Sequence, residues 1–560
     1  MTTEYIQLKK SNCKSCYKCI RNCPVKSIRF SGNQAQIIAQ DCICCGECFV
    51  VCPQDAKFIK DDTEKARVLL CSGDPVIASV APSFAANYPD VGIGEMERAL
   101  KALGFAGAEE TAIGATIVKK EYENILAKDR KNVLISSCCP TVNKLIQRYF
   151  HDVLPALARV VSPMRAHAKD IKRRIPNAKV VFIGPCISKK AEADESEGDV
   201  DCVLTFEELS GWFQEKNIQL EAVPSPREDS LTRIFPTSGG IIKSMDRSKA
   251  SSYSYIAIDG HQNCLDALSD IAAGRLSHCF VEMSACRGSC TGGPVLSKKH
   301  HSPVRDYISV TKYAGSCDYP VEMPTEESIA KNFLALRSDG LAPSEPEIRD
   351  ILRQMGKESS ADELNCGSCG YNTCREKAVA IYQGKADLTM CTPFLRDKAE
   401  TSMNTILKNT PNGILMLNDV LEVQQINPVA LEILNIRNAF DVIGEQVVRI
   451  LDPEDFMEVR RSGRSLHNKK VYLAEYDKYI EETIVYDRTF HIFFCMITDI
   501  TEEEHLRESK ETLNRQTIET ADKVIEKQMR IVQEIASLLG ETTAETKIAL
   551  TKLKESLTDA

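Results

Sequence analysis

The sequence has little of what a membrane protein or a general nucleic-acid binder needs. None of its 560 residues falls in an uninterrupted apolar run of about 18 residues, the length that a membrane span requires. The first residues, Met1 to Tyr5, lack the basic and then apolar segments of a secretory signal. The formal net charge of -9 lacks the basic excess typical of nucleic-acid binding. We therefore expect a cytoplasmic protein whose partners are proteins and small redox species.

Cysteine, in contrast, is abundant. A chain of 560 residues is too long for one core and should divide into roughly three to five domains. It contains 24 cysteines, and many of them are grouped at fixed spacings. In a reducing cytoplasm, such groups bind metal far more often than they form disulfides. The cysteine groups therefore define the class of protein to consider.

The first group is a duplicated run, C-x2-C-x2-C-x3-C-P, typical of bacterial two-cluster ferredoxins. In that pattern three close thiolates bind one 4Fe-4S cluster and the fourth reaches the other cluster. Zinc is the alternative, but a zinc site closes with four ligands and does not explain the duplication. We expect a two-cluster domain over residues 1–65, with these ligand sets: Cys13, Cys16, Cys19 with Cys52, and Cys42, Cys45, Cys48 with Cys23.

Residues 68–335 alternate short apolar runs with amphipathic stretches, which predicts an α/β layer structure. Several apolar runs end in small residues or cysteine, as ligand sites do at strand ends in open α/β sheets. The sequence therefore predicts that four strand ends converge on one buried cofactor. These runs and their ends are Val76 to Val80 before Pro82 and Ser83, Val133 to Ile135 before Cys138 and Cys139, Val180 to Ile183 before Cys186, and Cys279 to Val281 before Cys286.

Cys286 and Cys290 form a C-x3-C pair followed by Gly292 and Gly293, and glycine lets backbone approach a bulky cofactor. Each cysteine taken alone is as well explained as a small buried residue. Four of them at matched strand ends favour a shared site.

Three of these segments resemble the cofactor-binding signatures of FeFe hydrogenases. They are the segments that contain Cys138 and Cys139, Cys186, and Cys286 with Cys290. The resemblance implies a 4Fe-4S cubane joined to a di-iron unit that carries carbonyl, cyanide and a dithiolate. It implies Cys139, Cys186, Cys286 and Cys290 as cubane ligands, with Cys290 as the bridging thiolate.

The resemblance also implies roles for residues around the cofactor. Lys189, in the same segment as Glu192, would hold one cyanide by a charge-assisted hydrogen bond, and Cys138 would relay protons. Pro82 and Ser83 would line the other end of the pocket. A lysine and a thiol could equally be surface features, but both lie inside matched motifs.

Some positions depart from the family pattern. Gly184 and Ser284 stand where catalytic members have methionine, and Val142 stands at an aromatic position. These changes remove contacts around the di-iron unit and favour slow turnover. For the carboxylates expected beyond Cys138, the sequence offers Glu121 and Glu123.

The fourth group, C-x2-C-x4-C-x16-C, comprises Cys366, Cys369, Cys374 and Cys391. It resembles a small 4Fe-4S domain of corrinoid iron-sulfur proteins and of sensory-type hydrogenases, and we place that domain at residues 345–400. A helix over 375–384 is expected to return the chain to Cys391. Zinc again is the alternative.

The remaining chain lacks such groups. Residues 401–501 resemble a PAS domain, whose last strand leads through Asp499-Ile500-Thr501 into a signalling helix. Residues 502–560 are charged and helical, with Val524, Ile531 and Leu538 spaced by seven, as in a coiled coil. These two segments predict a homodimer.

The expected fold class is α/β multidomain: a ferredoxin-like two-cluster domain, an α/β hydrogenase H-cluster domain, a small 4Fe-4S domain, an α+β PAS domain and a C-terminal coiled coil. Three functions fit it. The first is an anaerobic sensor in which hydrogen reacts at the H-cluster and electrons pass through three accessory 4Fe-4S clusters to a PAS output and a separate effector. The second is a catalytic hydrogenase linked to ferredoxin, and the third is an iron-sulfur conduit or scaffold. The PAS segment, with Gly184 and Ser284, favours the sensor, and hydrogenase maturases would be needed to load it.

Overall fold

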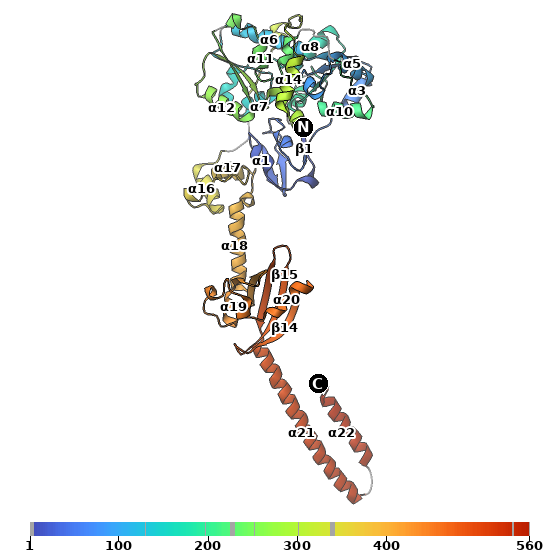
Figure 1. The fold of residues 1–560 in the computed structure, drawn as a ribbon, viewed down its shortest axis with the longest axis vertical. Helices are drawn as coiled ribbons and strands as arrows, with labels where there is room; N and C mark the ends of the chain where they lie inside the picture. Colours follow the sequence, from blue (N-terminus) through green and yellow to red (C-terminus); the bar gives the residue numbers. More distant parts are fainter. Residues whose placement is uncertain are drawn as a thin grey trace. The chain divides into compact units, whose positions relative to one another are not determined.

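The computed structural model describes residues 5–128, 130–196, 198–223, 230–250, 252–300, 302–336, 342–539 and 543–558. The chain divides into two compact units, Met1–Leu395 and Arg396–Ala560. Figure 1 colours them along the chain, from blue to red. All sixteen predicted cluster ligands lie in the first unit, and the predicted PAS and coiled-coil segments lie in the second.

The amino-terminal module, residues 5–60, has two antiparallel strand pairs and two short helices around a shared core. β1 (Ile6–Leu8) pairs with β4 (Lys57–Ile59), and β2 (Ile28–Ser31) pairs with β3 (Gln34–Ile37). Helices α1 (Lys18–Asn22) and α2 (Glu47–Val50) pack against each other and carry Cys19 and Cys48. The two cysteine runs therefore lie side by side.

The central α/β part contains two parallel sheets. One has the strand order β6-β5-β8-β9, and the other has the order β10-β11-β7. Every residue of β5 is buried, as expected of a parallel strand covered on both faces. The strands are β5 (Val76–Val80), β6 (Gly107–Glu110), β7 (Val133–Ile135), β8 (Lys179–Gly184), β9 (Cys202–Thr205), β10 (Ser254–Asp259) and β11 (Cys279–Ser284).

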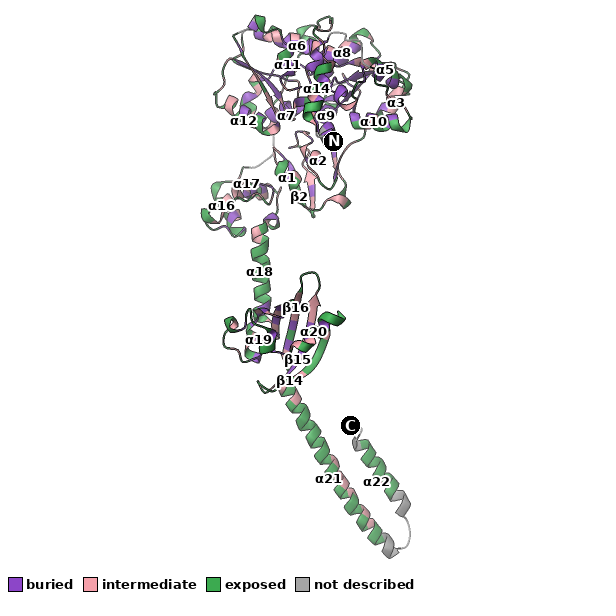
Figure 2. Ribbon diagram, in the orientation of Figure 1, coloured by how far each residue is buried: buried purple, intermediate pink, exposed green. Residues whose placement is uncertain are grey.

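Helices surround these sheets, and Figure 2 shows that buried residues concentrate here. Local sequence sets several helix starts: Pro140 and Pro163 occupy first-turn positions, and Thr205 forms a capping box with Glu208. The helices are α3 (Thr63–Leu70), α4 (Phe84–Asn87), α5 (Ile93–Ala102), α6 (Ala112–Ala127), α7 (Pro140–Tyr149), α8 (Pro163–Arg174), α9 (Ser188–Asp194), α10 (Phe206–Glu215), α11 (Gly240–Ser244), α12 (His261–Ala272), α13 (Pro294–His300), α14 (Pro303–Tyr313) and α15 (Glu326–Ile329).

The four predicted strands are confirmed as β5, β7, β8 and β11. β11 is longer than its apolar run because Glu282 to Ser284 continue to pair with β10. Since all these strands are parallel to their neighbours, the segments after them leave from the carboxyl edges of their sheets.

The small cysteine domain contains α16 (Glu345–Gln354) and α17 (Cys374–Tyr382), which pack against each other. The helix expected over 375–384 is α17, which begins one residue earlier because Thr373 caps it by accepting a hydrogen bond from the Glu376 amide.

The second unit begins within α18 (Thr392–Asn409) and contains an antiparallel sheet of order β13-β12-β16-β15-β14. The sheet encloses a core with α19 (Pro428–Ile433) and α20 (Pro453–Ser462). Cys495 lies fully buried in that core. The strands are β12 (Gly413–Asn418), β13 (Val423–Ile426), β14 (Leu466–Leu473), β15 (Lys478–Asp487) and β16 (Ile492–Asp499).

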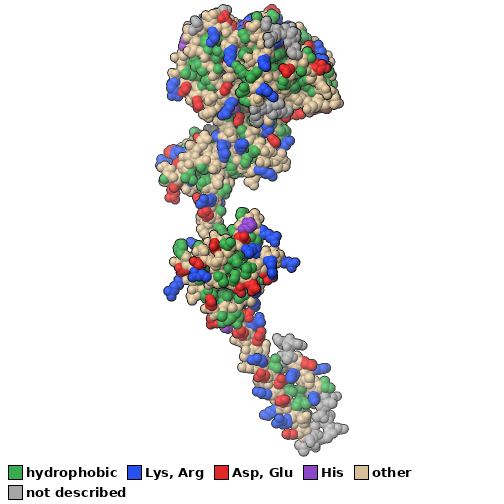
Figure 3. Space-filling model, in the orientation of Figure 1, with side chains coloured by type: hydrophobic (Ala, Val, Ile, Leu, Met, Phe, Trp, Pro, Cys, Tyr) green, Lys and Arg blue, Asp and Glu red, His purple; other side chains and the backbone are tan. Residues whose placement is uncertain are grey.

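After β16 the chain forms α21 (Thr501–Leu539), which packs against α22 (Thr543–Thr558). Val524 and Ile531 are exposed on α21, whereas the side chain of Leu538 lies outside the described residues. Figure 3 shows hydrophobic side chains on the visible surface of this unit. Within the described ranges, every helix is too short or too polar to cross a membrane.

Candidate functional site

The four predicted cubane ligands lie together at the strand ends. Burial raises the pKa of the Cys286 thiol, and the neighbouring thiolates of Cys186, Cys139 and Cys290 raise it further. Burial likewise raises the pKa of Cys290 to about 12, and Cys186 and Cys139 contribute to the increase. Part of the Cys290 side chain nevertheless remains accessible to solvent. Buried thiolates that repel one another need a bound cation, and the iron atoms of a cubane would supply it.

The loop that carries Cys286 and Cys290 is folded tightly. An added Cβ at Gly292 would lie 1.7 Å from the Arg287 carbonyl oxygen, and one at Gly293 would lie 3.0 Å from the Pro185 Cβ atom. Only glycine fits at position 292, and the close contact at Gly293 brings the loop against the segment that holds Cys186.

Lys189 lies among these cysteines. Its ammonium donates to a carboxylate oxygen of Glu192 at 2.6 Å and to the Cys138 carbonyl at 3.4 Å. Burial alone would lower the pKa of Lys189, but Glu192 and then the nearby thiolates raise it above its usual range. The lysine is therefore held as a cation beside the cysteine set, where an anionic ligand could bind.

The Cys138 thiol contacts a tyrosine that the sequence did not single out. The Tyr122 hydroxyl lies 3.3 Å from the Cys138 sulfur and 3.0 Å from the Ser137 hydroxyl, and it accepts from the Ser137 amide at 2.8 Å. Burial raises the pKa of Cys138 to about 12. Its position on α6 gave Tyr122 no sequence signal beyond its apolar character.

The carboxylates offered for the proton route, Glu121 and Glu123, hydrogen-bond to groups other than Cys138. Glu123 accepts from the Asp246 amide, and Glu121 accepts from the Asn124 side chain. The carboxylates that raise the pKa of Cys138 are instead those of Glu282 and Glu192. Burial raises the pKa of Glu282 to about 7.

Pro82 and Ser83 lie at the same sheet edge as the Cys186 segment, because β5 pairs with β8 up to Val80 and Ile183. Both are buried, and among the described residues the Ser83 hydroxyl has no hydrogen-bond partner. A buried hydroxyl without a partner is costly unless a ligand supplies one. Ser83 therefore fits a pocket for a polar group.

The departures from the hydrogenase pattern have local explanations. An added Cβ at Gly184 would lie 2.7 Å from the Phe182 ring, so that ring fills the space of a side chain. The Ser284 hydroxyl hydrogen-bonds to the Ser289 hydroxyl at 2.8 Å, and Val142 is fully buried in the neighbouring core.

The amino-terminal cysteines are near the partners predicted from their spacing. Burial raises the pKa of Cys19 to about 11, opposed by Lys57 and reinforced by Cys13, Cys16 and Cys52. Burial also raises the pKa of Cys45, and the neighbouring thiolates of Cys23, Cys42 and Cys48 raise it further. Each run thus has the last cysteine of the other run as a neighbour.

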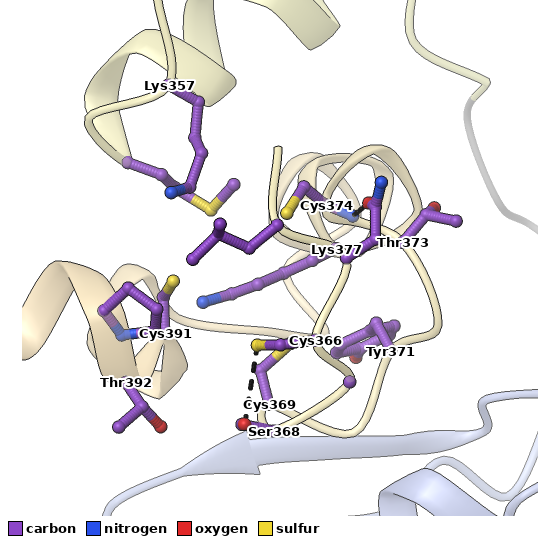
Figure 4. A pocket seen from close by; sticks show the side chains of 15 residues that line it. Lys357, Cys366, Ser368, Cys369, Tyr371, Thr373, Cys374, Lys377, Cys391 and Thr392 are labelled. Carbon is purple, nitrogen blue, oxygen red and sulfur yellow. Dashed lines mark hydrogen bonds between the residues drawn. The ribbon is translucent and has the colours of Figure 1, made fainter. Parts of the chain in front are cut away.

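The fourth group surrounds a pocket in the small domain. Figure 4 shows Cys366, Cys369, Cys374 and Cys391 around it, with the Lys377 side chain extended between them. Lys377 is 1% exposed and donates to the Leu388 carbonyl at 3.2 Å. A buried cation beside four cysteines would offset the negative charge of a cluster. Sequence reasoning missed this lysine because it lies on a helix without a motif.

Among the described residues, no three cysteine, histidine or acidic side chains are close enough to bind a single metal ion. The cysteines of a cubane stand farther apart, since each binds a different iron atom.

The amino-terminal module adjoins the strand-end site. One cavity is lined by Cys23, Cys45 and Cys286, and Cys45 also acts electrostatically on Cys286. An added Cβ at Gly46 would lie 2.6 Å from Pro294 and 2.8 Å from Ile187, so the module is seated directly on the central α/β part.

Comparison with known proteins agrees with these features. Residues 74–294 match the family model of the iron-only hydrogenase large subunit, C-terminal domain, and residues 362–393 match an Fe-S cluster family. The chain is an iron-sulfur protein of mixed α/β architecture. Its central part, residues 74–294, is a domain of the iron-only hydrogenase family.

The curated relatives are distant. The chain is 25% identical over 305 residues to the periplasmic [Fe] hydrogenase large subunit of Nitratidesulfovibrio vulgaris, covering 44% of this chain and 72% of that protein. It is 27% identical over 323 residues to the NADP-reducing hydrogenase subunit HndD of Solidesulfovibrio fructosivorans, covering 45% and 55%. It is 24% identical over 237 residues to the cytosolic Fe-S cluster assembly factor NAR1 of Yarrowia lipolytica, covering 36% and 48%. The chain thus spans only about half the length of the last two.

Two matches among solved structures are of different kinds, and both have low TM-scores. One is the apo FeFe-hydrogenase HydA1 of Chlamydomonas reinhardtii, with a TM-score of 0.38, 17% identity, and coverage of 50% of this chain and 100% of that one. The other is the PAS domain of an HTR-like protein from Haloarcula marismortui, with a TM-score of 0.16, 16% identity, and coverage of 19% and 99%.

Proposed function

We propose that this protein is a sensory hydrogenase. Cys139, Cys186, Cys286 and Cys290 would hold an H-cluster, which would supply the reversible reaction with hydrogen, and three accessory 4Fe-4S clusters would carry the electrons. The observation that carries the proposal is the convergence of these four thiols around a buried lysine cation, in a domain of the iron-only hydrogenase family.

The residues around the cofactor would have distinct tasks. When bound, the di-iron unit supplies the centre at which hydrogen is split or formed. The Lys189 ammonium holds an anionic ligand of that unit, and Glu192 keeps the lysine charged and oriented. The Ser83 hydroxyl offers a hydrogen bond inside the pocket. Cys138 exchanges protons with the reacting centre, and Tyr122 holds its thiol in place.

We assign signalling to the second unit, which lacks the grouped cysteines of the first. Its antiparallel sheet leads directly from β16 into the 39-residue helix α21. Exposed Val524 and Ile531 on that helix are spaced for a seam between two copies of the chain. A PAS domain followed by a dimeric coiled coil would pass a redox change to a separate cytoplasmic effector.

Two other functions have some support. A catalytic hydrogenase that exchanges electrons with ferredoxin is favoured by the hydrogenase relatives and by the retained Lys189 and Cys138. A non-catalytic iron-sulfur role is favoured by the similarity to assembly factor NAR1. Gly184 and Ser284, which stand where catalytic members have methionine, favour slow chemistry over the catalytic alternative.

Infrared spectroscopy of anaerobically matured protein tests the cofactor. Carbonyl and cyanide bands that shift between hydrogen and inert gas, and that vanish in Cys290→Ala, are expected. Their absence in protein with full cubane occupancy would leave the non-catalytic role. The sensory role is tested separately. Amide hydrogen–deuterium exchange of the second unit is measured under H2 gas and under inert gas. Unchanged exchange and an unchanged oligomeric state would refute signalling and leave catalysis.

A further inference from the structure

A lysine joins the small cysteine domain to the amino-terminal module. The Lys26 ammonium donates to the carbonyls of Ile20 at 3.2 Å and Arg21 at 3.0 Å, which lie near the carboxyl end of α1. It also donates to the Gly370 carbonyl, at 3.0 Å, in the cysteine loop of the small domain. A cation is favoured at a helix carboxyl end, so α1 itself helps to hold the lysine there.

The two surfaces meet closely around this lysine. An added Cβ at Gly370 would lie 3.0 Å from the Ile20 side chain and 3.2 Å from the Arg21 amide, and the φ of Gly370 is +93°. Arg21 also donates to the Ser368 carbonyl at 3.2 Å. Tyr371 is 2% exposed and shares a hydrophobic core with Ile20. The cysteine loop is therefore packed onto α1.

A second bridge lies away from the lysine. The Phe30 amide donates to the Lys385 carbonyl at 3.1 Å, and the Lys385 ammonium pairs with Asp41 at 2.7 Å. Two separate contacts prevent the small domain from rotating on the module. The orientation of the cysteine loop is therefore fixed.

Lys26 also stands between two cysteine sets. Burial lowers the pKa of Lys26 below its usual range, and Arg21 lowers it further, whereas the thiolates of Cys23 and Cys369 and the carboxylate of Glu376 oppose this shift by attracting the ammonium. Cys369 and Cys23 both act on the neighbouring Tyr371 as well. In contrast, Lys57 is the cation that acts most on Cys19, in the other amino-terminal set.

We propose that Lys26 is a positioning residue that fixes the small domain's cluster beside the Cys23-containing cluster and lends positive charge to both. This inference rests on the proposed function, because it requires cubanes in both sets. Electron transfer between these two clusters would move a single electron. One cubane would be oxidised by one electron and the other reduced by one electron, with no bond formed or broken and no proton transferred. The small domain thereby joins the electron route at the module that adjoins Cys286.

The test uses the full chain with its cubanes reconstituted and without the di-iron unit, so it does not depend on hydrogenase activity. Lys26→Met removes the charge and the three hydrogen bonds at similar length, and Lys26→Arg restores the charge. Lys18→Met is the matched control, since Lys18 is exposed on α1, the helix whose carbonyls Lys26 contacts. Cys369→Ser identifies the signals of the small domain's cluster. Potentiometric titration followed by electron paramagnetic resonance gives the midpoint potential of each cluster and the spin coupling between reduced clusters.

In Lys26→Met, we expect the midpoint potentials of two clusters to fall: the one bound by the Cys366 set (Cys366, Cys369, Cys374 and Cys391) and the one bound by the Cys23 set (Cys42, Cys45, Cys48 and Cys23). A nearby cation stabilises the reduced form of a cluster, so its removal makes reduction harder. The spin coupling between these two clusters should weaken, whereas the Cys13 set should keep its potential. Lys26→Arg should behave as the wild type. Equal shifts of all three clusters, or a Lys26→Met titration identical to that of Lys18→Met, would overturn the inference. A wild type with no cubane in the Cys366 set would overturn the proposed three-cluster route itself.

Discussion

The ion pair between Lys189 and Glu192 gives the sharpest quantitative prediction. Its ammonium and carboxylate are 2.6 Å apart, and the side chains are 10% and 2% exposed. At an effective dielectric constant of about 20, two unit charges at this distance attract by roughly 6 kcal/mol. Loss of solvation offsets part of this attraction, but removing one partner leaves the other charge buried. We therefore expect Glu192→Gln to lower the free energy of unfolding by about 3 to 5 kcal/mol in cluster-free protein.

The sequence contains a single tryptophan, Trp212, and this makes the measurement local. Trp212 is 3% exposed and belongs to the core cluster that contains β8, the strand before α9. Its fluorescence during urea unfolding reports the stability of the layer that holds the ion pair. Glu97→Gln is the control, because Glu97 pairs with Lys101 on the solvent-accessible side of α5, and loss of this exposed pair should cost less than about 1 kcal/mol.

The reasoning also predicts how the two partners combine. Lys189→Met together with Glu192→Gln leaves no unpaired charge, so the double variant should be more stable than the sum of the single effects implies. Additive effects, or a cost of Glu192→Gln similar to that of Glu97→Gln, would refute the buried pair as described. In matured protein the cost should be smaller, because an anionic cofactor ligand would compensate Lys189.

Three further predictions follow from other contacts. Tyr122→Phe should shift the S–H infrared band of Cys138, assigned with Cys138→Ala, and should destabilise the protein by about 1 to 3 kcal/mol, because the Ser137 amide loses its acceptor. Lys377→Met should lower the midpoint potential of the small domain's cluster in a potentiometric titration, and an unchanged potential would exclude its charge as a determinant. In the second unit, burial raises the pKa of Glu482 to about 7, and the neighbouring carboxylate of Asp455 contributes to the increase. Because the folded state favours its protonated form, stability should fall as the pH rises from about 4.5 to 7, by about 2 kcal/mol or less. Glu482→Gln should abolish this loss, as measured by hydrogen exchange of β12 and β16 corrected for intrinsic rates.

Much of the fold was predictable because the signals are local. Short apolar runs followed by small residues or cysteine predicted β5, β7, β8 and β11, since parallel strands buried on both faces are continuously apolar. The duplicated cysteine run predicted which thiols would become neighbours, because cluster ligation imposes the spacing.

Contacts between segments that are distant in the chain could not be predicted from the sequence. Tyr122 and Lys377 are helix residues that belong to no motif, and their importance comes only from the thiols that the fold brings to them. The sequence predicted that Gly184 removes a side-chain contact, but it did not indicate that the Phe182 ring occupies that space. Likewise, no spacing rule indicates that Lys26 meets Gly370, because the two are separated by 344 positions.

The seating of the amino-terminal module also has a consequence for biosynthesis. This module precedes in the chain the surfaces that cover it, and these are translated much later: Ile187 and Pro294 against Gly46, and Gly370 against Ile20. At about 5 to 20 residues per second, roughly 15 to 60 s separate the translation of residue 60 from that of residue 370. During that interval the cysteines around Cys23 and Cys45 remain open to iron-sulfur donors, and completion of the chain then closes over them. The order of translation therefore favours loading the innermost accessory cluster before its surroundings assemble.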